Sequence, residues 1–267
     1  MNSWRFLDSG PSDGATNMAV DEAIFEGVGA GSSPPTVRVY AWEPPAVSVG
    51  HSQNASSELD LAACRERGFG VVRRPTGGRA VLHAGEITYS VIGSAGVPPL
   101  GGSIPESYRE IARALLAGLA EIGVEAELAP VATASRNRGE VAPPCFVSAG
   151  RFEVVVGGRK LVGSAQRRSG AAVLQHGSLL TDGTHEQIAD VLRLPNESDR
   201  EAIRRTLARK ATDLSSLLSG PVEYRRLATA IRTGFEKAWG FELAPGALTE
   251  RESVAVRRLT TDRRAVC

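Results

Sequence analysis

Two residue types suited to acyl transfer lie fifteen positions apart in the second half of the chain, namely Cys145 in "APPCFVSAG" and Lys160 in "GGRKLVGSAQ". A thiolate attacks a thioester or another activated carbonyl, and a neighbouring ammonium lowers the pKa of the thiol that supplies it. The same ammonium stabilises the oxyanion formed during the attack. On residue types alone, a small core cysteine and a solvent-facing turn lysine are the commoner interpretations.

A second candidate is the segment "VVRRPTGGRAVLH", residues 71–83, which lies between stretches typical of strands. Glycines let backbone N–H groups approach a ligand, and Arg73 and Arg74 supply donors for a phosphate or a carboxylate. The segment therefore predicts a loop that cradles a ligand. A Thr-Gly-Gly hairpin turn between two edge strands, with exposed arginines, is an equally good alternative. The pattern matches neither the phosphate loop of P-loop enzymes nor the dinucleotide-binding fingerprint.

The other cysteines indicate neither a metal site nor a disulfide framework. Cys64 lies in an amphipathic segment and Cys267 is the last residue, and the sequence contains no CxxC pair and no His/Cys cluster at metal-ligand spacing. His83 and His176 fall in expected strands, where each is more simply a hydrogen-bonded structural histidine than a base. We therefore expect no bound metal.

The elements that must position these residues are read from periodicity and turn signals. Alternating apolar residues predict strands at residues 36–42, 46–50, 86–92, 151–156, 159–166 and 172–180. The Gly157-Gly158 pair predicts a tight hairpin, because such a turn needs positive φ at its centre. One helix is expected at residues 16–28 with Thr16 as its cap, and another after Ser103, which forms a capping box with Glu106.

From about residue 184 the pattern becomes helical, with segments near residues 184–192, 198–211, 222–239 and 249–259. Strands and helices do not alternate regularly, so we expect an α+β fold with a mixed, largely antiparallel sheet surrounded by helices. We expect residues 1–267 to form a single domain, with a core at about 33–245 and a helical C-terminal part from about 184.

Composition narrows the classes of function. A net charge of +1, 42% apolar and 23% charged residues in 267 are ordinary for a globular enzyme and argue against nucleic-acid binding. The arginine pairs are typical of solvated helix faces, and a local basic patch that docks an acidic protein is a more modest possibility. The N-terminus lacks a signal-peptide pattern and no run of about 18 apolar residues occurs. We expect a cytoplasmic protein that does not enter a membrane.

Three segments stand in the order found in one enzyme superfamily: "NMAVDEAI", "VVRRPTGGRAVLH" and "GRKLVGSAQRRSGAAVLQHGSLL". From about Trp4 to about Leu180 the chain resembles the lipoate-protein ligases and octanoyltransferases, a superfamily that includes biotin protein ligases. The block around Cys145 and Lys160 resembles the LipM-type octanoyltransferases. This resemblance implies a class II synthetase/biotin-lipoate ligase-like catalytic domain over residues 1–267, in which the arginine-glycine segment lines a pocket for a medium-length acyl chain.

The resemblance also implies roles for individual residues. Cys145 would accept the acyl group, and Lys160 would stabilise the thiolate and the tetrahedral intermediate. The implied substrate-binding residues are Arg73, Arg74, Thr76, Gly77, Gly78, Arg79, His83, Gly163, Ser164, Ala165, His176 and Gly177.

Two positions depart from the patterns of relatives. Arg79 stands where ligases often carry a third glycine, which leaves the backbone less free to approach an adenylate phosphate. Ala84 follows His83, where many relatives carry an acidic residue, and Glu86 is the candidate substitute. The first departure favours a transferase over a ligase.

The activity implied by the resemblance is octanoyl transfer in lipoate biosynthesis. Octanoyl-acyl carrier protein would donate, and a lipoyl-domain lysine of the glycine cleavage H protein or of a 2-oxoacid dehydrogenase E2 would accept, without ATP or a metal. One alternative is a lipoate-protein ligase that uses ATP and magnesium and leaves Cys145 incidental. Others are an amidotransferase acting between two lipoyl domains and a non-catalytic acyl-carrier-binding protein.

Overall fold

The computed structural model describes residues 3–129 and 152–264, and within them the chain forms an eight-stranded and a three-stranded sheet. The larger sheet has the strand order β11 (Ala244–Pro245), β1 (Arg5–Ser12), β2 (Thr36–Trp42), β6 (Glu86–Ser94), β10 (Ala172–Leu180), β9 (Arg159–Ser169), β8 (Val154–Val156) and β7 (Glu127–Leu128). Strand β1 is parallel to β2 and β11, and the other neighbouring pairs of this sheet are antiparallel. The expectation of a mixed, largely antiparallel sheet is confirmed.

The smaller sheet carries the arginine-glycine segment. Its central strand β3 (Ala46–Val49) is parallel to β4 (Gly70–Arg73) and antiparallel to β5 (Val81–His83). Because β4 and β5 each pair with β3, residues 74–80 pass from one side of β3 to the other. The alternative of a tight hairpin turn at the Thr-Gly-Gly sequence is therefore wrong. Two short helices, α2 (Ala55–Glu58) and α3 (Leu61–Glu66), connect β3 to β4.

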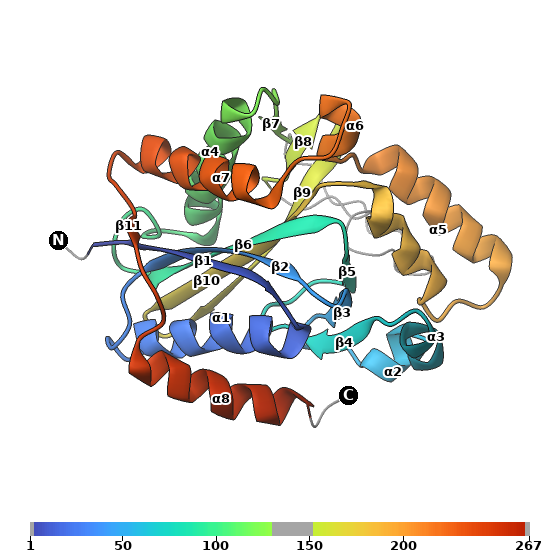
Figure 1. The fold of residues 1–267 in the computed structure, drawn as a ribbon, viewed down its shortest axis with the longest axis horizontal. Helices are drawn as coiled ribbons and strands as arrows, with labels where there is room; N and C mark the ends of the chain where they lie inside the picture. Colours follow the sequence, from blue (N-terminus) through green and yellow to red (C-terminus); the bar gives the residue numbers. More distant parts are fainter. Residues whose placement is uncertain (1–2, 130–151, 265–267) are drawn as a thin grey trace.

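Helices cover both faces of the larger sheet, as Figure 1 shows. On one face lies α1 (Gly14–Gly29), with α8 (Glu250–Arg264) packed along it, and on the other lie α4 (Ile104–Glu121) and α7 (Tyr224–Trp239), side by side. The α4/α7 side buries Ile111, Leu115, Phe235, Val37 and Ile87, and the α1 side buries Val20, Ile24, Ile92 and Leu174. Burying a side chain of this size contributes about 1.5–3 kcal/mol, so these two layers fix the sheet between the helices.

Local capping explains where the first long helices begin. Helix α1 begins at Gly14 because the Asp13 carboxylate accepts a hydrogen bond from the Thr16 backbone N–H at 2.9 Å. The expectation that Thr16 is the cap is thus wrong by three residues. Helix α4 begins after Ser103, and the capping box with Glu106 is confirmed.

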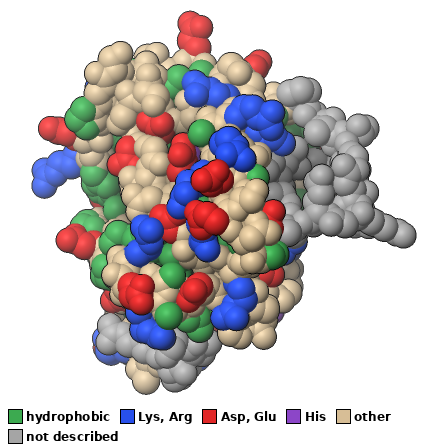
Figure 2. Space-filling view, turned by 90° about the vertical axis from the view of Figure 1, so that its right-hand side faces the viewer, with side chains coloured by type: hydrophobic (Ala, Val, Ile, Leu, Met, Phe, Trp, Pro, Cys, Tyr) green, Lys and Arg blue, Asp and Glu red, His purple; other side chains and the backbone are tan. Residues whose placement is uncertain are grey.

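The remaining predicted elements are present in the described chain. The turn between β8 and β9 has φ of +55° at Gly157 and +74° at Gly158, as a tight primed turn requires. After β10 come the 3₁₀ helix η1 (Gly183–Asp190), α5 (Glu197–Lys210) and α6 (Leu214–Leu218). Figure 2 looks onto the side of the molecule that carries α5. In the part of the chain that the structure describes, no helix is long and apolar enough to span a bilayer.

The ends of the described chain meet at one edge of the larger sheet. Strand β1, which periodicity did not reveal, lies between β11 and β2. The guanidinium of Arg5 donates to both carboxylate oxygens of Glu252 on α8, at 2.8 and 2.7 Å, and both side chains are buried. This bidentate pair joins the first strand to the last helix.

Candidate active site

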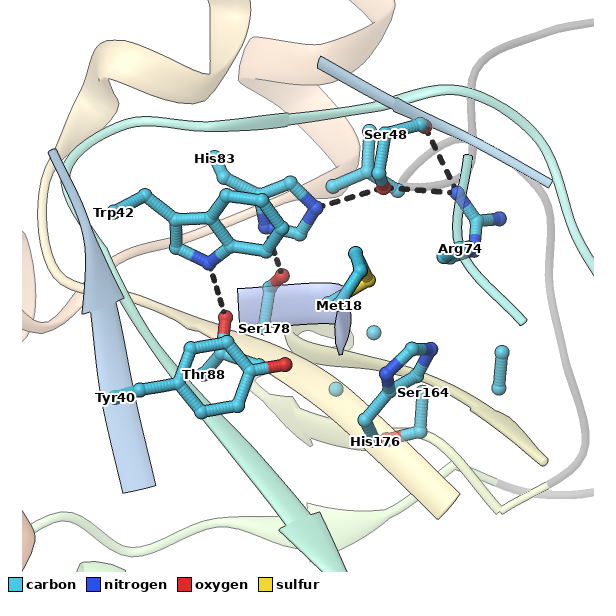
Figure 3. A pocket seen from close by; sticks show the side chains of 14 residues that line it. Met18, Tyr40, Trp42, Ser48, Arg74, His83, Thr88, Ser164, His176 and Ser178 are labelled. Carbon is cyan, nitrogen blue, oxygen red and sulfur yellow. Dashed lines mark hydrogen bonds between the residues drawn. The ribbon is translucent and has the colours of Figure 1, made fainter. Parts of the chain in front are cut away.

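A cavity of about 360 Å³ is lined by residues from both sheets and from α1 (Figure 3). This volume is within the range of small-molecule sites. Its lining comprises Met18, Tyr40, Trp42, Ser48, Arg74, Val81, His83, Thr88, Gly163, Ser164, Ala165, His176, Gly177 and Ser178. Seven of the residues implied by the resemblance are among these, so segments far apart in the sequence meet here.

The polar side chains on one wall are hydrogen-bonded to one another. His83 Nε2 lies 2.8 Å from Ser48 Oγ, and His83 Nδ1 lies 3.3 Å from Ser178 Oγ. The indole of Trp42 stacks on the His83 ring with centroids 3.8 Å apart, as Figure 3 shows, and its N–H donates to Thr88 Oγ1 at 2.8 Å. Burial lowers the pKa of His83 below its ordinary value, which favours a neutral imidazole near pH 7. This wall therefore has no formal charge on the histidine.

Arg74 is directed at the protein's own backbone. It is 4% exposed, and its guanidinium donates to the carbonyls of Ser48 at 2.9 Å, Gly77 at 2.8 Å and Arg79 at 2.7 Å. It also donates to Ser48 Oγ at 3.1 Å. These bonds tie residues 74–80 to β3, so Arg74 shapes the cavity by holding its loop in place.

A buried carboxylate lies beneath the cavity, and the sequence analysis did not single it out. Asp21, on α1, accepts hydrogen bonds from Arg38 at 2.7 Å, Tyr40 at 2.9 Å and Ser90 at 2.8 Å. Burial alone would raise the pKa of Asp21, but the Arg38 guanidinium and the hydrogen bond from His176 outweigh it and lower the pKa to about 2. Asp21 is therefore ionised in the folded protein.

A sequence signal for Asp21 was available. Asn17 and Asp21 lie four positions apart in "NMAVDEAI", beside the buried apolar residues Val20 and Ile24. Two short polar side chains on the buried side of a helix indicate a partner in the core, because an unpaired buried polar group is costly. That partner is Arg38, which donates to Asn17 Oδ1 at 3.0 Å as well as to Asp21.

His176 links this carboxylate to the arginine-glycine loop. Its Nδ1 lies 3.2 Å from Asp21 Oδ2, and its Nε2 lies 2.6 Å from Thr76 Oγ1. A carboxylate only accepts hydrogen bonds, so Nδ1 carries the proton and the Thr76 hydroxyl donates to Nε2. Asp21, His176 and Thr76 thus connect α1, β10 and the loop in one chain of hydrogen bonds.

The β9 and β10 segments close the cavity from below because they approach each other very tightly. A Cβ at Gly177 would lie 2.6 Å from Ser164 Oγ and 2.7 Å from the Gly163 carbonyl oxygen. The Ser164 hydroxyl is itself 2.7 Å from Tyr89 OH. Glycine at position 177 is therefore required by packing.

Four of the implied pocket residues lie away from the lining of this cavity. Arg73 donates to the carbonyls of Gly50, His51 and Gln53, at 3.1, 2.9 and 2.6 Å. Arg79 Nη1 lies 3.3 Å from Glu58 Oε1. Gly77 and Gly78 pack against the backbone at Gly50, where an added Cβ would lie 2.2 Å from the Gly78 carbonyl oxygen. These glycines allow two loops to approach each other, whereas the sequence analysis assigned them to the acyl group.

Lys160 lies at the start of β9, and its side chain is 6% exposed. The Lys160 ammonium forms an ion pair with the Glu153 carboxylate, and its backbone carbonyl accepts a hydrogen bond from Thr212 at 2.9 Å. The alternative of a solvent-facing turn lysine is therefore wrong. Cys145 lies outside the described residues.

Glu86 does face His83, as the departure at Ala84 suggested. The Glu86 side chain is 1% exposed, its Oε1 lies 3.3 Å from His83 Nδ1, and it accepts a hydrogen bond from Thr88 at 2.7 Å. Ala84 is buried and contributes to an apolar cluster with Leu82 and Leu180. A carboxylate two positions further along thus takes a place beside the histidine.

The arrangement is suited to an elongated apolar ligand beside a buried cation. Most polar groups of the wall are hydrogen-bonded to other wall residues, so an alkyl chain can enter without stripping them of partners. Among residues 3–129 and 152–264, no group of His, Cys, Asp and Glu side chains is arranged to hold a metal ion.

Comparison with known sequences identifies full-length relatives. The profile of the lipoyl protein ligase A/B catalytic domain matches residues 13–236. An octanoyltransferase LipM of Kyrpidia tusciae is 45% identical over 263 residues, which cover 97% of this chain and 95% of the relative. An octanoyltransferase LipM of Symbiobacterium thermophilum is 44% identical over 262 residues, covering 96% and 94%.

Comparison with solved structures identifies the same fold. A lipoate-protein ligase A bound with ATP superimposes with a TM-score of 0.78 at 23% identity, over 98% of this chain and 96% of that one. A bipartite lipoate protein ligase of Thermoplasma acidophilum gives a TM-score of 0.81 at 23% identity, over 99% and 94%. The expected ligase-like α+β architecture is thereby confirmed.

Proposed function

The chain belongs to the lipoyl protein ligase A/B catalytic-domain family and is an octanoyltransferase, and on this premise we propose that it takes octanoate from octanoyl-acyl carrier protein. The family implies a lipoyl domain as the acceptor. We propose that its lysine, in the glycine cleavage H protein or in a 2-oxoacid dehydrogenase E2, receives the chain as an amide. The product is octanoylated protein.

The observation that carries this proposal is the self-satisfied polar wall of the cavity. An octanoyl tail offers no hydrogen bonds, so wall groups that needed a ligand partner would lose free energy when it bound. Here Ser48, His83 and Ser178 bond to one another, and Trp42 bonds to Thr88. The wall therefore presents ring faces and hydrocarbon to the chain, with a volume suited to a short acyl group.

The proposed reaction has two steps of acyl transfer through Cys145. The Cys145 thiolate attacks the octanoyl carbonyl, the carbon–sulfur bond to the carrier breaks, and the carrier thiol leaves with a proton. The lipoyl-domain amine then attacks the new thioester, the amide forms, the amine proton passes to solvent, and the Cys145 thiolate is released. Both steps proceed without ATP and without a metal ion under this proposal.

Lys160 would supply the positive charge for both steps. A buried ammonium that is paired with Glu153 stays protonated, because the carboxylate offsets the desolvation cost of the charge. An ammonium lowers the pKa of a neighbouring thiol and stabilises a tetrahedral oxyanion. The resemblance to LipM-type enzymes places Cys145 beside this lysine as a hypothesis.

Intact mass measurement tests the covalent step. Incubation with octanoyl-acyl carrier protein and no nucleotide should add one octanoyl group, which peptide mapping should assign to Cys145. The Cys145→Ser protein should acquire no such group and should transfer octanoate at least about 1000-fold more slowly. Cys64→Ala is the matched control, because Cys64 is buried beside α3 and should not take part.

The same experiment separates the alternatives. A Cys145→Ser protein with full transfer activity that depends on ATP and magnesium would support the ligase and overturn this mechanism. Tight binding of the acylated carrier without any covalent adduct on the wild-type protein would support a non-catalytic binding role. A strong preference for an octanoylated lipoyl domain as donor would indicate an amidotransferase.

A further inference from the structure

The cations on the side of the molecule that carries α5 divide into two groups. Along most of α5 each arginine has an acidic partner: Arg200 pairs with Glu197 at 2.9 Å, and Arg205 pairs with Glu201 at 3.2 Å. Arg204 pairs with Asp190 of η1. This stretch of the helix is therefore close to neutral.

The C-terminal end of α5 differs. Arg209 and Lys210 occupy its last turn, are exposed, and form no ion pair with another described residue. Arg159, the first residue of β9, is also exposed and lacks an ion pair in residues 3–129 and 152–264. In Figure 2, Lys and Arg side chains lie next to one another toward the upper right, while charges of both signs alternate across the centre.

These three cations surround the backbone of the candidate catalytic lysine. Lys160 forms a β-bridge with Ala211, the residue after Lys210, and Thr212 donates to the Lys160 carbonyl at 2.9 Å. Arg159 immediately precedes Lys160. The α5 basic end, defined as Arg159, Arg209 and Lys210, thus lies where β9 brings Lys160 to the surface.

Helix stability does not account for all three charges. Basic residues in a last turn interact favourably with the carbonyl end of the helix dipole, which gives Arg209 and Lys210 a structural reason. Arg159 belongs to a strand and has no such reason. The Lys160 and Glu153 charges offset each other, so three positive charges remain on this surface.

We propose that the α5 basic end is the docking surface for the acidic acyl carrier domain that presents the octanoyl thioester. This inference rests on the proposed function and adds where the donor binds. Clustered cations attract an acidic partner over about one Debye length and orient it before contact. Arginines also form bidentate bonds to a phosphodiester, the group that joins a carrier domain to its acyl-bearing arm. Docking beside Lys160 directs that arm toward the reaction centre.

Charge reversal with two donors tests the surface. In the Arg159→Glu, Arg209→Glu, Lys210→Glu triple variant, the rate of octanoyl-enzyme formation from octanoyl-acyl carrier protein should fall about 10- to 100-fold at low salt. Octanoyl-pantetheine offers the same thioester without charge or carrier domain. Its rate should change less than about twofold, because Coulombic steering does not act on a neutral donor.

Controls separate docking from folding and from position. The Arg251→Glu, Arg257→Glu variant reverses two exposed arginines of α8 and should react with both donors at the wild-type rate. A triple glutamine variant of the α5 basic end removes the charges with less cost to the helix, and its carrier rate should fall between those of wild type and the glutamate variant. Its thermal transition should match that of wild type.

Several results would overturn the proposal. An equal loss with both donors would show that the substitutions disturb the reaction centre, and an unchanged carrier rate would show that the surface does not dock the donor. A slower transfer from preformed octanoyl-enzyme to the lipoyl domain, with normal acylation by the carrier, would assign the surface to the acceptor. Wild-type protein that forms no adduct with either donor would instead contradict the proposed function.

Discussion

The inner and outer cations of this molecule have opposite roles although they are the same kinds of residue. Arg38 and Arg74 are 1% and 4% exposed, and their guanidinium groups donate to Asp21 and to loop carbonyls. Arg209 and Lys210 are exposed and lack an acidic partner among the described residues. The comparison teaches that the acceptors within reach, and not the residue type, decide whether a cation stabilises the fold or is left for a partner.

The inner set is tested most strongly by Asp21→Asn. The substitution keeps the shape but leaves the buried Arg38 guanidinium without its carboxylate, so the free energy of unfolding should fall by about 3–5 kcal/mol in urea titrations. Asp8→Asn is the matched control, because exposed Asp8 accepts a hydrogen bond from Tyr224, and it should cost less than about 1 kcal/mol. Equal losses would mean that the buried network adds no stability.

The next largest effect is expected for Arg74→Met. The carbonyls of Ser48, Gly77 and Arg79 would lose a buried donor, which should lower the free energy of unfolding by about 3 kcal/mol. Displacement of the loop should slow acylation by octanoyl-pantetheine about 100-fold in single-turnover assays. Arg73→Met should have a smaller effect on both, because water can reach its half-exposed carbonyl partners. A raised KM with unchanged stability would instead assign Arg74 to the ligand.

The acid limb of stability should reveal the Asp21 network. The pKa of Asp21 falls from 3.8 to about 2 on folding, so its contribution is complete above about pH 4 and is lost as the pH drops toward 2. The stability difference between wild type and Asp21→Asn should therefore shrink by about 2 kcal/mol over this interval. Urea titrations at several pH values measure it, and a constant difference would contradict the lowered pKa.

The smallest effects are expected for the outer set. Arg209→Gln and Lys210→Gln should each change the free energy of unfolding by less than about 0.5 kcal/mol. Each should slow acylation by the carrier about two- to threefold, an effect that added salt removes. A stability loss as large as that of Arg74→Met would remove the distinction between the two sets.

Local features were predictable from sequence because their causes lie within a few residues. The capping box at Ser103 and the positive φ angles at Gly157 and Gly158 depend on neighbours in the chain, and both predictions are confirmed. Three of the four helices expected after residue 184 also appear within a few residues of their expected ends, and the first is the 3₁₀ helix η1.

The site was harder to predict because it depends on distant partners. Asp21 meets Arg38 from 17 positions away and His176 from 155 positions away, and no periodicity carries that information. Arg74 was read as a ligand contact because its nearest acceptors, on β3, become neighbours only when β4 and β5 pair with that strand. Local pattern identified which segments meet, but not which side chains turn inward.

The position of β1 has a consequence for synthesis on the ribosome. Arg5 finds its partner Glu252 at a separation of 247 residues, and β1 cannot gain its outer neighbour β11 until residue 245 has emerged. The first strand of a nascent chain must therefore wait, unprotected on one edge, while nearly everything else is translated. Release of the finished polypeptide, rather than any earlier stage, completes this edge of the sheet.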